Sequence, residues 1–142
     1  MNNNFNAESF FKFKALFDAA MDGAASGAAG RSGITQRQAR LLSDLFYRGE
    51  GVPAEALERR GFSSEAEKLV SLKMAQIDRD GLLTLTGRGK IAGKSVCSAQ
   101  EKFLEELLKK ISPEEAFIIS GAAEKISSLL REEAQNINKN HG

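Results

Sequence analysis

The chain has 142 residues, a formal net charge of +1 and a hydrophobic content of 42%, a composition typical of folded proteins and not of disordered segments. Its length suits one domain with a sizeable core, and no apolar run reaches the length of a membrane span. The only cysteine, Cys97, excludes an internal disulfide. We therefore expect a single-domain, cytoplasmic protein that does not associate with a membrane.

Charge is spread unevenly along the chain. Residues 35–94 hold 11 basic and 8 acidic residues, whereas residues 95–142 hold 6 basic and 8 acidic ones. The middle is therefore modestly basic and the C-terminal part modestly acidic. This asymmetry is compatible with nucleic-acid binding but does not require it.

The first predicted element is an amphipathic helix over residues 7–22, in which Phe10, Phe13 and Phe17 recur at helical spacing. Such an aromatic stripe is expected to be buried against another surface, which would cover it. The cover is either other helices, from this chain or a dimer mate, or an aromatic ligand in a pocket. The Gly-, Ala- and Ser-rich residues 23–33 predict a flexible connection or a poorly held helix end.

Three helices are predicted in the middle of the chain. The first covers residues 35–48 and is capped by its threonine. A short helix over 54–60 has Pro53 at its first position. A third, over 64–75, opens with the capping-box pattern Ser64-Glu65-Ala66-Glu67.

A tight β-hairpin is predicted next, because Asp80-Gly81 lies between two short apolar runs and Gly adopts the positive φ of such turns at little cost. Thr86 then caps a long helix over about 88–110, and Ser112-Pro113 opens another. A short helix, a hairpin and a new helix form the ending of a winged helix-turn-helix. That architecture offers nucleic acid a helix that fits the major groove and a protruding hairpin.

Four short motifs occur in order along the chain: Thr35-Gln36-Arg37-Gln38-Ala39-Arg40-Leu41-Leu42, Asp78-Arg79-Asp80, Leu85-Thr86-x-x-Gly89 and Ile111-Ser112-Pro113-Glu114-Glu115. In that order, they resemble the second-helix opening, the wing signature, the entry to the fifth helix and the last-helix opening of the MarR family of bacterial transcription regulators. The resemblance implies a mainly α fold with a small β-hairpin wing, in a single domain over 1–142. Residues 35–94 would form the winged lobe, and residues 1–34 and 95–142 the dimerisation helices.

The resemblance also implies the activity. A homodimer would bind double-stranded DNA at a pseudo-palindromic operator, with one winged lobe per half-site and half-sites about ten base pairs apart. We expect a repressor, with a small-molecule effector as a candidate ligand. No enzymatic activity, cofactor or metal is expected. A transition-metal site would need more ligands than one cysteine and one histidine supply.

The residues expected at DNA lie on the recognition helix, on the wing and at the start of the next helix: Ser63, Ser64, Lys68, Ser71, Lys73, Arg79 and Arg88. Arg79, at the hairpin tip, either enters the minor groove or is a solvated arginine paired with a neighbouring aspartate. Ser63 and Ser64 either contact DNA or only cap their helix. Lys73 and Arg88 either contact phosphates or are simply solvated.

Two glutamates near the start of the recognition helix, Glu65 and Glu67, should face DNA and oppose its phosphates, although a glutamate can also accept a hydrogen bond from cytosine. Together with the short wing, they favour an alternative: a MarR-like protein that has lost DNA binding and acts through protein–protein interaction. Oxidant sensing by Cys97 is a further hypothesis, which requires an accessible thiol with a lowered pKa.

Overall fold

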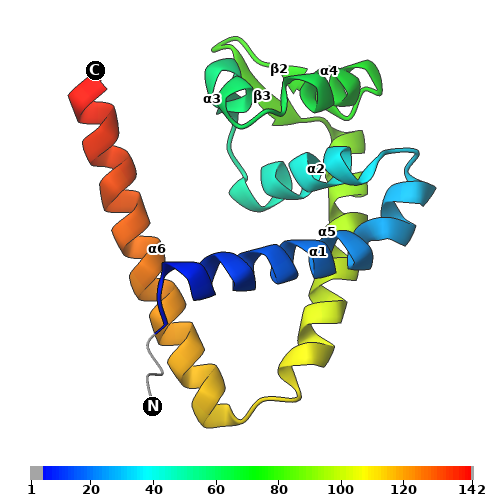
Figure 1. The fold of residues 1–142 in the computed structure, drawn as a ribbon. Coiled ribbons are helices and arrows are strands. Elements are labelled where there is room, and N and C mark those ends of the chain that lie inside the picture. Colours follow the sequence, from blue (N-terminus) through cyan, green and yellow to red (C-terminus); the bar gives the residue numbers. More distant parts are fainter. Residues whose placement is uncertain (1–4, 142) are drawn as a thin grey trace. The chain divides into compact units, whose positions relative to one another are not determined.

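The computed structural model describes residues 5–141, with side chains up to residue 136. The described part divides after Phe103 into two compact units. Unit 1 holds α1 (Ala7–Arg31), α2 (Gln36–Arg48), β1 (Val52–Pro53), α3 (Ala54–Arg59), α4 (Ser63–Ser71), β2 (Ala75–Ile77), β3 (Leu82–Leu85) and most of α5 (Gly87–Leu108) (Figure 1). Unit 2 holds the end of α5 and α6 (Pro113–His141). None of the described helices is both long and apolar enough to cross a membrane.

Helix α1 is longer than predicted, because it continues through the glycine-rich residues to Arg31. Its second half packs on α2 through three alanines that are at most 2% exposed: Ala25, Ala28 and Ala29. Small side chains let the two helices approach closely, and this packing outweighs a cost of about 1 kcal/mol for each helical glycine. Residues 23–31 are therefore a well-packed helix end, and the prediction of a flexible connection or a poorly held helix end over 23–33 is wrong.

Helix α2 confirms its prediction at both ends. The Thr35 hydroxyl accepts a hydrogen bond from the Gln38 amide at 3.2 Å, and the Gln38 side chain accepts one from the Thr35 amide at 3.0 Å. Gly49 ends the helix in the left-handed conformation, with φ of 69°. This reciprocal cap fixes where the winged lobe begins.

Three predictions about the shorter helices are wrong. Helix α4 begins at Ser63 and has no side-chain cap, so the capping box at Ser64 does not form. It ends at Ser71, because the chain turns into the left-handed region at Lys73 (φ 63°) and then enters β2. Pro53 lies one residue earlier than predicted, at the N-cap position of α3.

The hairpin is confirmed, with a third strand that was not predicted. The antiparallel sheet has the order β1-β3-β2, and β1 pairs Val52 with Leu83. In the turn, the Asp78 amide donates to the Leu82 carbonyl at 2.9 Å, and Gly81 has φ of 76°. A three-residue loop that ends in a left-handed glycine is a common hairpin connection.

The core of unit 1 determines how α4 and the sheet sit on the other helices. Its largest fully buried side chains come from four elements: Leu41 and Leu42 of α2, Leu69 of α4, Leu83 of β3, and Val96 and Cys97 of α5. Figure 1 shows α3, α4 and the β2–β3 hairpin gathered at one end of this unit, over α2. The buried leucines thus hold α4 and the β2–β3 hairpin on one scaffold.

In unit 2, α6 begins where predicted. The Ser112 hydroxyl accepts from the Glu115 amide at 3.1 Å, and the Glu115 carboxylate accepts from the Ser112 amide at 2.8 Å. None of the α6 side chains that the structure describes is buried, and Phe117 and Ile118 are 81% and 68% exposed. A helix with such a bare apolar face needs a partner surface.

Candidate nucleic-acid interface

Helix α4 presents one continuous outward face. Ala66 and Leu69 are buried in the core, while the residues that point away from it are exposed: Ser63, Ser64, Glu67, Lys68 and Ser71. At 100° per residue these five fall within an arc of about 140°. Four of the residues predicted to contact DNA are thus brought together on one helix face. The proposed capping function of Ser63 and Ser64 is absent, which leaves both hydroxyls on this face.

Glu65 does not share this face, contrary to prediction. Its carboxylate accepts a hydrogen bond from the Arg37 guanidinium of α2 at 2.8 Å, and its side chain is only 14% exposed. The same arginine donates to the Gly61 carbonyl at 2.9 Å and lies 5.0 Å from the centre of the Phe62 ring. The Arg37 hydrogen bond holds the pKa of the Glu65 carboxyl below its usual value. Glu65 therefore fixes α4 on α2 and does not project toward a ligand.

The cations of unit 1 fall into two groups. Four arginines are neutralised within the unit: in α2, Arg37 by Glu65 and Arg40 by Asp22, and both Arg48 of α2 and Arg60, which follows α3, by Asp44. By contrast, within residues 5–136 no ion pair involves the four basic residues predicted to contact DNA, Lys68, Lys73, Arg79 and Arg88. All four are exposed. Their charge is available to an external anion.

Arg79 lies in the turn between β2 and β3, at the tip of the wing. The neighbouring Asp78 carboxylate is engaged by the backbone, because it accepts from the Asp80 amide at 2.9 Å and from the Leu82 amide at 3.0 Å. These two hydrogen bonds stabilise the turn, and Arg79 takes no part in them. Among the described side chains neither Asp78 nor Asp80 forms an ion pair with Arg79, which leaves the guanidinium to project from the tip.

Thr86 caps α5 as predicted, and together with Gly89 it also joins the wing, α4 and α5, which the sequence did not reveal. The Thr86 hydroxyl donates to the Lys73 carbonyl at 2.6 Å and accepts from the Gly89 amide at 3.1 Å. The Thr86 amide donates to the Met74 carbonyl at 3.1 Å. A side chain at Gly89 would place its Cβ 1.8 Å from that same carbonyl oxygen, so only glycine fits there. The Leu-Thr-x-x-Gly motif thus has a steric reason.

Lys73 occupies this joint in a conformation that favours glycine. Its amide donates to the Val70 carbonyl at 3.0 Å, and the Met74 amide donates to the Leu69 carbonyl at 2.9 Å. This pair of bonds is the usual helix-ending arrangement with a left-handed residue, which is Gly33 after α1 and Gly61 after α3. A lysine there carries a backbone cost of about 1–2 kcal/mol. Lys73 is exposed and lies in the short segment between α4 and the wing strand β2.

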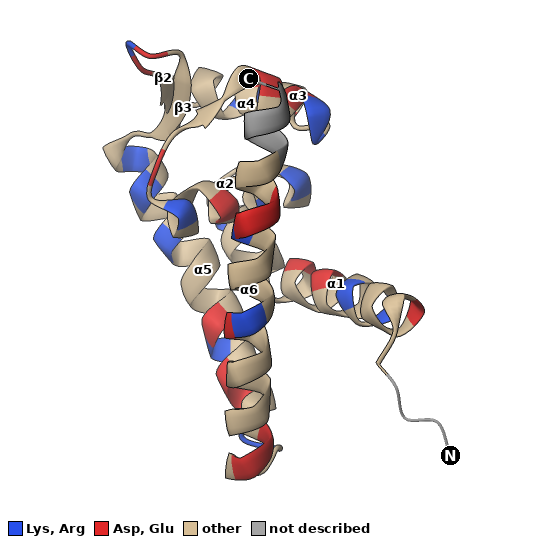
Figure 2. Cartoon of the chain, turned by 90° about the vertical axis from the view of Figure 1, so that its left-hand side faces the viewer, with Lys and Arg blue, Asp and Glu red and all other residues tan. Residues whose placement is uncertain are grey.

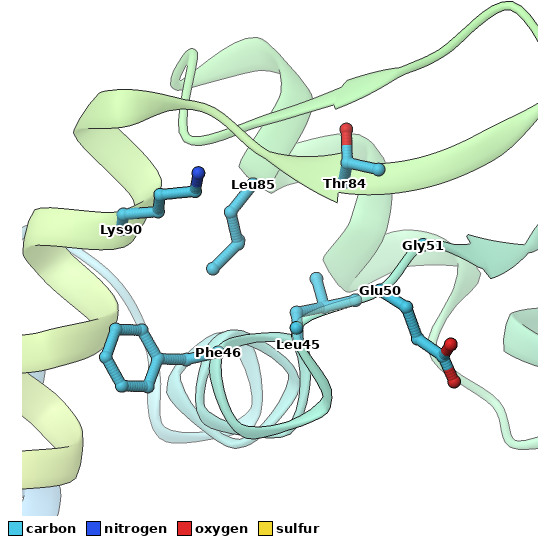
Figure 3. Close-up of a pocket in the computed structure, with 8 residues that line it drawn as sticks. Leu45, Phe46, Glu50, Gly51, Thr84, Leu85 and Lys90 are labelled. Atoms are coloured by element: carbon cyan, nitrogen blue, oxygen red, sulfur yellow. The ribbon is translucent and has the colours of Figure 1, made fainter.

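A hollow of about 330 Å³ lies between the end of α2, the sheet and the start of α5 (Figure 3). Its apolar wall is formed by Leu45, Phe46 and Leu85, with the Lys90 ammonium at its side. The Glu50 carboxylate points away from it. An apolar hollow with one cation suits a small amphipathic anion.

Cys97 is 1% exposed, and its sulfur lies 3.4 Å from the Ser43 hydroxyl. Burial raises the pKa of its thiol. Oxidant sensing needs an exposed thiol with a lowered pKa, so this environment disfavours that hypothesis.

Solved structures of other proteins share this arrangement of helices and strands. No family model and no curated protein matches the chain. A MarR transcriptional regulator from Methanosarcina mazei Go1 aligns over 92% of this chain and 94% of its own, with a TM-score of 0.69 and 19% identity. The fold is that of the MarR regulators. In helix-turn-helix proteins generally, the second helix of the motif is the one that enters the major groove.

Two further MarR-fold structures are of Mycobacterium tuberculosis MarR family protein Rv2887. Its complex with salicylic acid aligns over 89% of this chain and 99% of that one, with a TM-score of 0.62 and 16% identity. Its complex with DNA aligns over 87% and 98%, with a TM-score of 0.59 and 16% identity. The fold prediction is confirmed; at these identities the likeness extends to the fold alone.

Proposed function

We propose that this protein is a DNA-binding transcription regulator of the MarR type, which acts as a homodimer and represses at a pseudo-palindromic operator. The observation that carries the proposal is the set of four exposed cations without ion pairs, placed on and around the outward face of α4 and at the wing tip. Figure 2 also shows Lys and Arg along the first turns of α5. The DNA complex of a protein with the same fold supports this assignment.

Each cation has a distinct expected function. Lys68, Ser63, Ser64 and Ser71 would meet the major groove, where the face of α4 reaches base edges. Arg79 would enter the minor groove. Lys73 and Arg88 would contact phosphates on either side and so position the lobe without reading sequence.

The homodimer is supported by apolar faces that their own units leave bare. On α1, Phe11, Phe13 and Leu16 are exposed, and on α6 so are Phe117 and Ile118. Surfaces of this kind mark interaction sites in monomers, and a two-fold dimer would cover them. Sedimentation equilibrium at micromolar concentration tests this assembly, and a clean monomer would contradict it.

Release by a small molecule is the effector part of the proposal. The hollow beside Lys90 has the size and the cation that a small amphipathic anion needs, and a protein with the same fold has been crystallised with salicylic acid. Isothermal titration with salicylate, using wild type and Lys90→Ala, tests this site. We expect heat of binding only with the wild type.

A second candidate function rests on Glu67. A carboxylate on the outward face of α4 opposes phosphates and favours a regulator that has exchanged DNA for a protein partner. The two functions are separated by titrating a labelled duplex, taken from the promoter upstream of the protein's own gene, against a scrambled duplex of equal length. Preference for the promoter duplex supports the regulator; equal weak binding or none supports the partner-binding alternative.

A matched pair of variants refines this titration. Lys68→Ala/Lys73→Ala/Arg88→Ala removes three unpaired cations, whereas Lys12→Ala/Lys14→Ala/Lys109→Ala removes three ion-paired ones. Both change the net charge equally. We expect only the first to flatten the salt dependence of DNA affinity, by about one unit of log–log slope for each lost phosphate contact.

A further inference from the structure

One acidic side chain remains in the middle of the outward face of α4. Glu65 is turned toward Arg37, so Glu67 alone carries negative charge among the five residues of the face. At 100° per residue, Ser63, Glu67 and Ser71 lie within about 80° of one another. Glu67 therefore stands near the centre line of the helix face that the proposed function directs at base edges.

Nothing in the described part of the chain neutralises Glu67. No ion pair involves it among side chains 5–136. On one side it borders a hollow of about 360 Å³ with apolar walls, formed by Ala54, Leu57, Val70 and Ile77. No cation lines that hollow. The carboxylate thus meets a ligand with its hydrogen-bonding capacity unused.

The major groove limits what such a carboxylate can bind. A carboxylate only accepts hydrogen bonds, and the base edges there offer two kinds of donor, the N4 amino group of cytosine and the N6 amino group of adenine. The adenine donor lies beside the N7 acceptor, which repels a carboxylate. Cytosine therefore remains the favoured base, whereas Gln in the same place would favour adenine because it can both donate and accept.

We infer that Glu67 is a specificity-determining residue that accepts a hydrogen bond from the amino group of a cytosine in each half-site of the DNA. This inference rests on the proposed function, since it assumes that the outward face of α4 enters the major groove. On this inference, the negative charge on α4 contributes to sequence specificity. Glu67 would disfavour sequences that lack the cytosine, because an unpaired carboxylate would then be left in the interface.

The test is selection from a library of 30-base-pair duplexes with randomised centres, using the full-length protein at moderate salt. Wild type, Glu67→Gln and the control Glu58→Gln are compared; the control removes the same charge from an exposed position of α3. We expect the wild type and the control to enrich a symmetric motif with the same C·G pair in both half-sites. Glu67→Gln should lose that preference, with a shift toward adenine at the same position.

Affinity for single duplexes completes the test. Replacing the selected C·G pair in both half-sites should weaken wild-type binding by at least about fivefold, and should change Glu67→Gln binding much less. An unchanged motif in Glu67→Gln, or a uniform gain of affinity for all sequences, would overturn the inference and leave the proposed function intact. Failure of the wild type to enrich any sequence would overturn both.

Discussion

Substitution of Gly89 by alanine tests the joint between the wing, the recognition helix and α5. The added Cβ would lie 1.8 Å from the Met74 carbonyl oxygen and 2.8 Å from its carbon. Both are backbone atoms, so no side-chain rotation can relieve the overlap. Either α5 or the strand-entry segment must move back by more than an ångström.

The expected loss of stability follows from the hydrogen bonds that this movement breaks. The Met74 carbonyl accepts the Thr86 amide, and the adjacent Lys73 carbonyl accepts the Thr86 hydroxyl. Losing these two bonds costs about 1 kcal/mol each, and overpacking adds about 1–3 kcal/mol. The higher helix propensity of alanine offsets about 1 kcal/mol of this loss. We therefore expect Gly89→Ala to lower the free energy of unfolding by about 2–4 kcal/mol.

Urea denaturation followed by far-ultraviolet circular dichroism measures this change at constant slope. Gly87→Ala is the matched control, because it lies two residues earlier in the same helix and its added Cβ meets nothing within 4 Å. Its stability should be unchanged, or higher by less than about 1 kcal/mol. If Gly89→Ala unfolded at the same urea concentration as Gly87→Ala, the steric account of the Leu-Thr-x-x-Gly motif would be refuted.

Four other substitutions give separable results. Arg79→Ala should weaken DNA binding by about 1–3 kcal/mol in fluorescence anisotropy and hardly alter stability; equal affinities would mean that the wing does not read DNA. Lys73→Gly should raise the free energy of unfolding by about 1 kcal/mol, because it relieves the left-handed lysine, yet lower the salt slope of DNA binding by about one unit. Arg37 lowers the folded-state pKa of Glu65, so the ionised carboxylate contributes to the free energy of unfolding, and wild type should lose this contribution as the pH falls below the ordinary value of 4.5. Glu65→Gln lacks the contribution already at neutral pH, so its free energy of unfolding should depend less steeply on pH in the acid range. Ile118→Glu should shift sedimentation toward the monomer; an unchanged dimer would place the interface elsewhere.

Local signals in the sequence were enough to predict most of the elements. The threonine cap of α2, the Asp-Gly turn and the Ser-Pro start of α6 each depend on residues within four positions of one another. Such interactions can be read from a single segment. The prediction failed where distant packing decides, as in α1, whose buried alanines keep a glycine-rich segment helical against α2.

The candidate site shows the same division. The sequence was sufficient to predict Ser63, Ser64, Lys68 and Ser71 on or just before the outward start of this helix, and the structure brings all four onto one face of α4. The orientation of Glu65 was not predictable, because its partner Arg37 lies 28 residues away on another helix. The short strand β1 was missed for a similar reason, since a two-residue strand exists only through its pairing with β3.

These placements also bear on how a protein with acidic residues in its recognition helix could bind DNA. Of the two glutamates that seemed to oppose the phosphates, one is neutralised inside the protein by Arg37 and contributes little repulsion. The other lies near the centre of the helix face, where base edges and not phosphates are the nearest groups in a major-groove complex. The exposed cations Lys73, Arg79 and Arg88 lie outside α4, on the joint, the wing and the start of α5. We therefore expect low affinity for arbitrary DNA together with strong discrimination at the operator, and the ratio of the two affinities measures this directly.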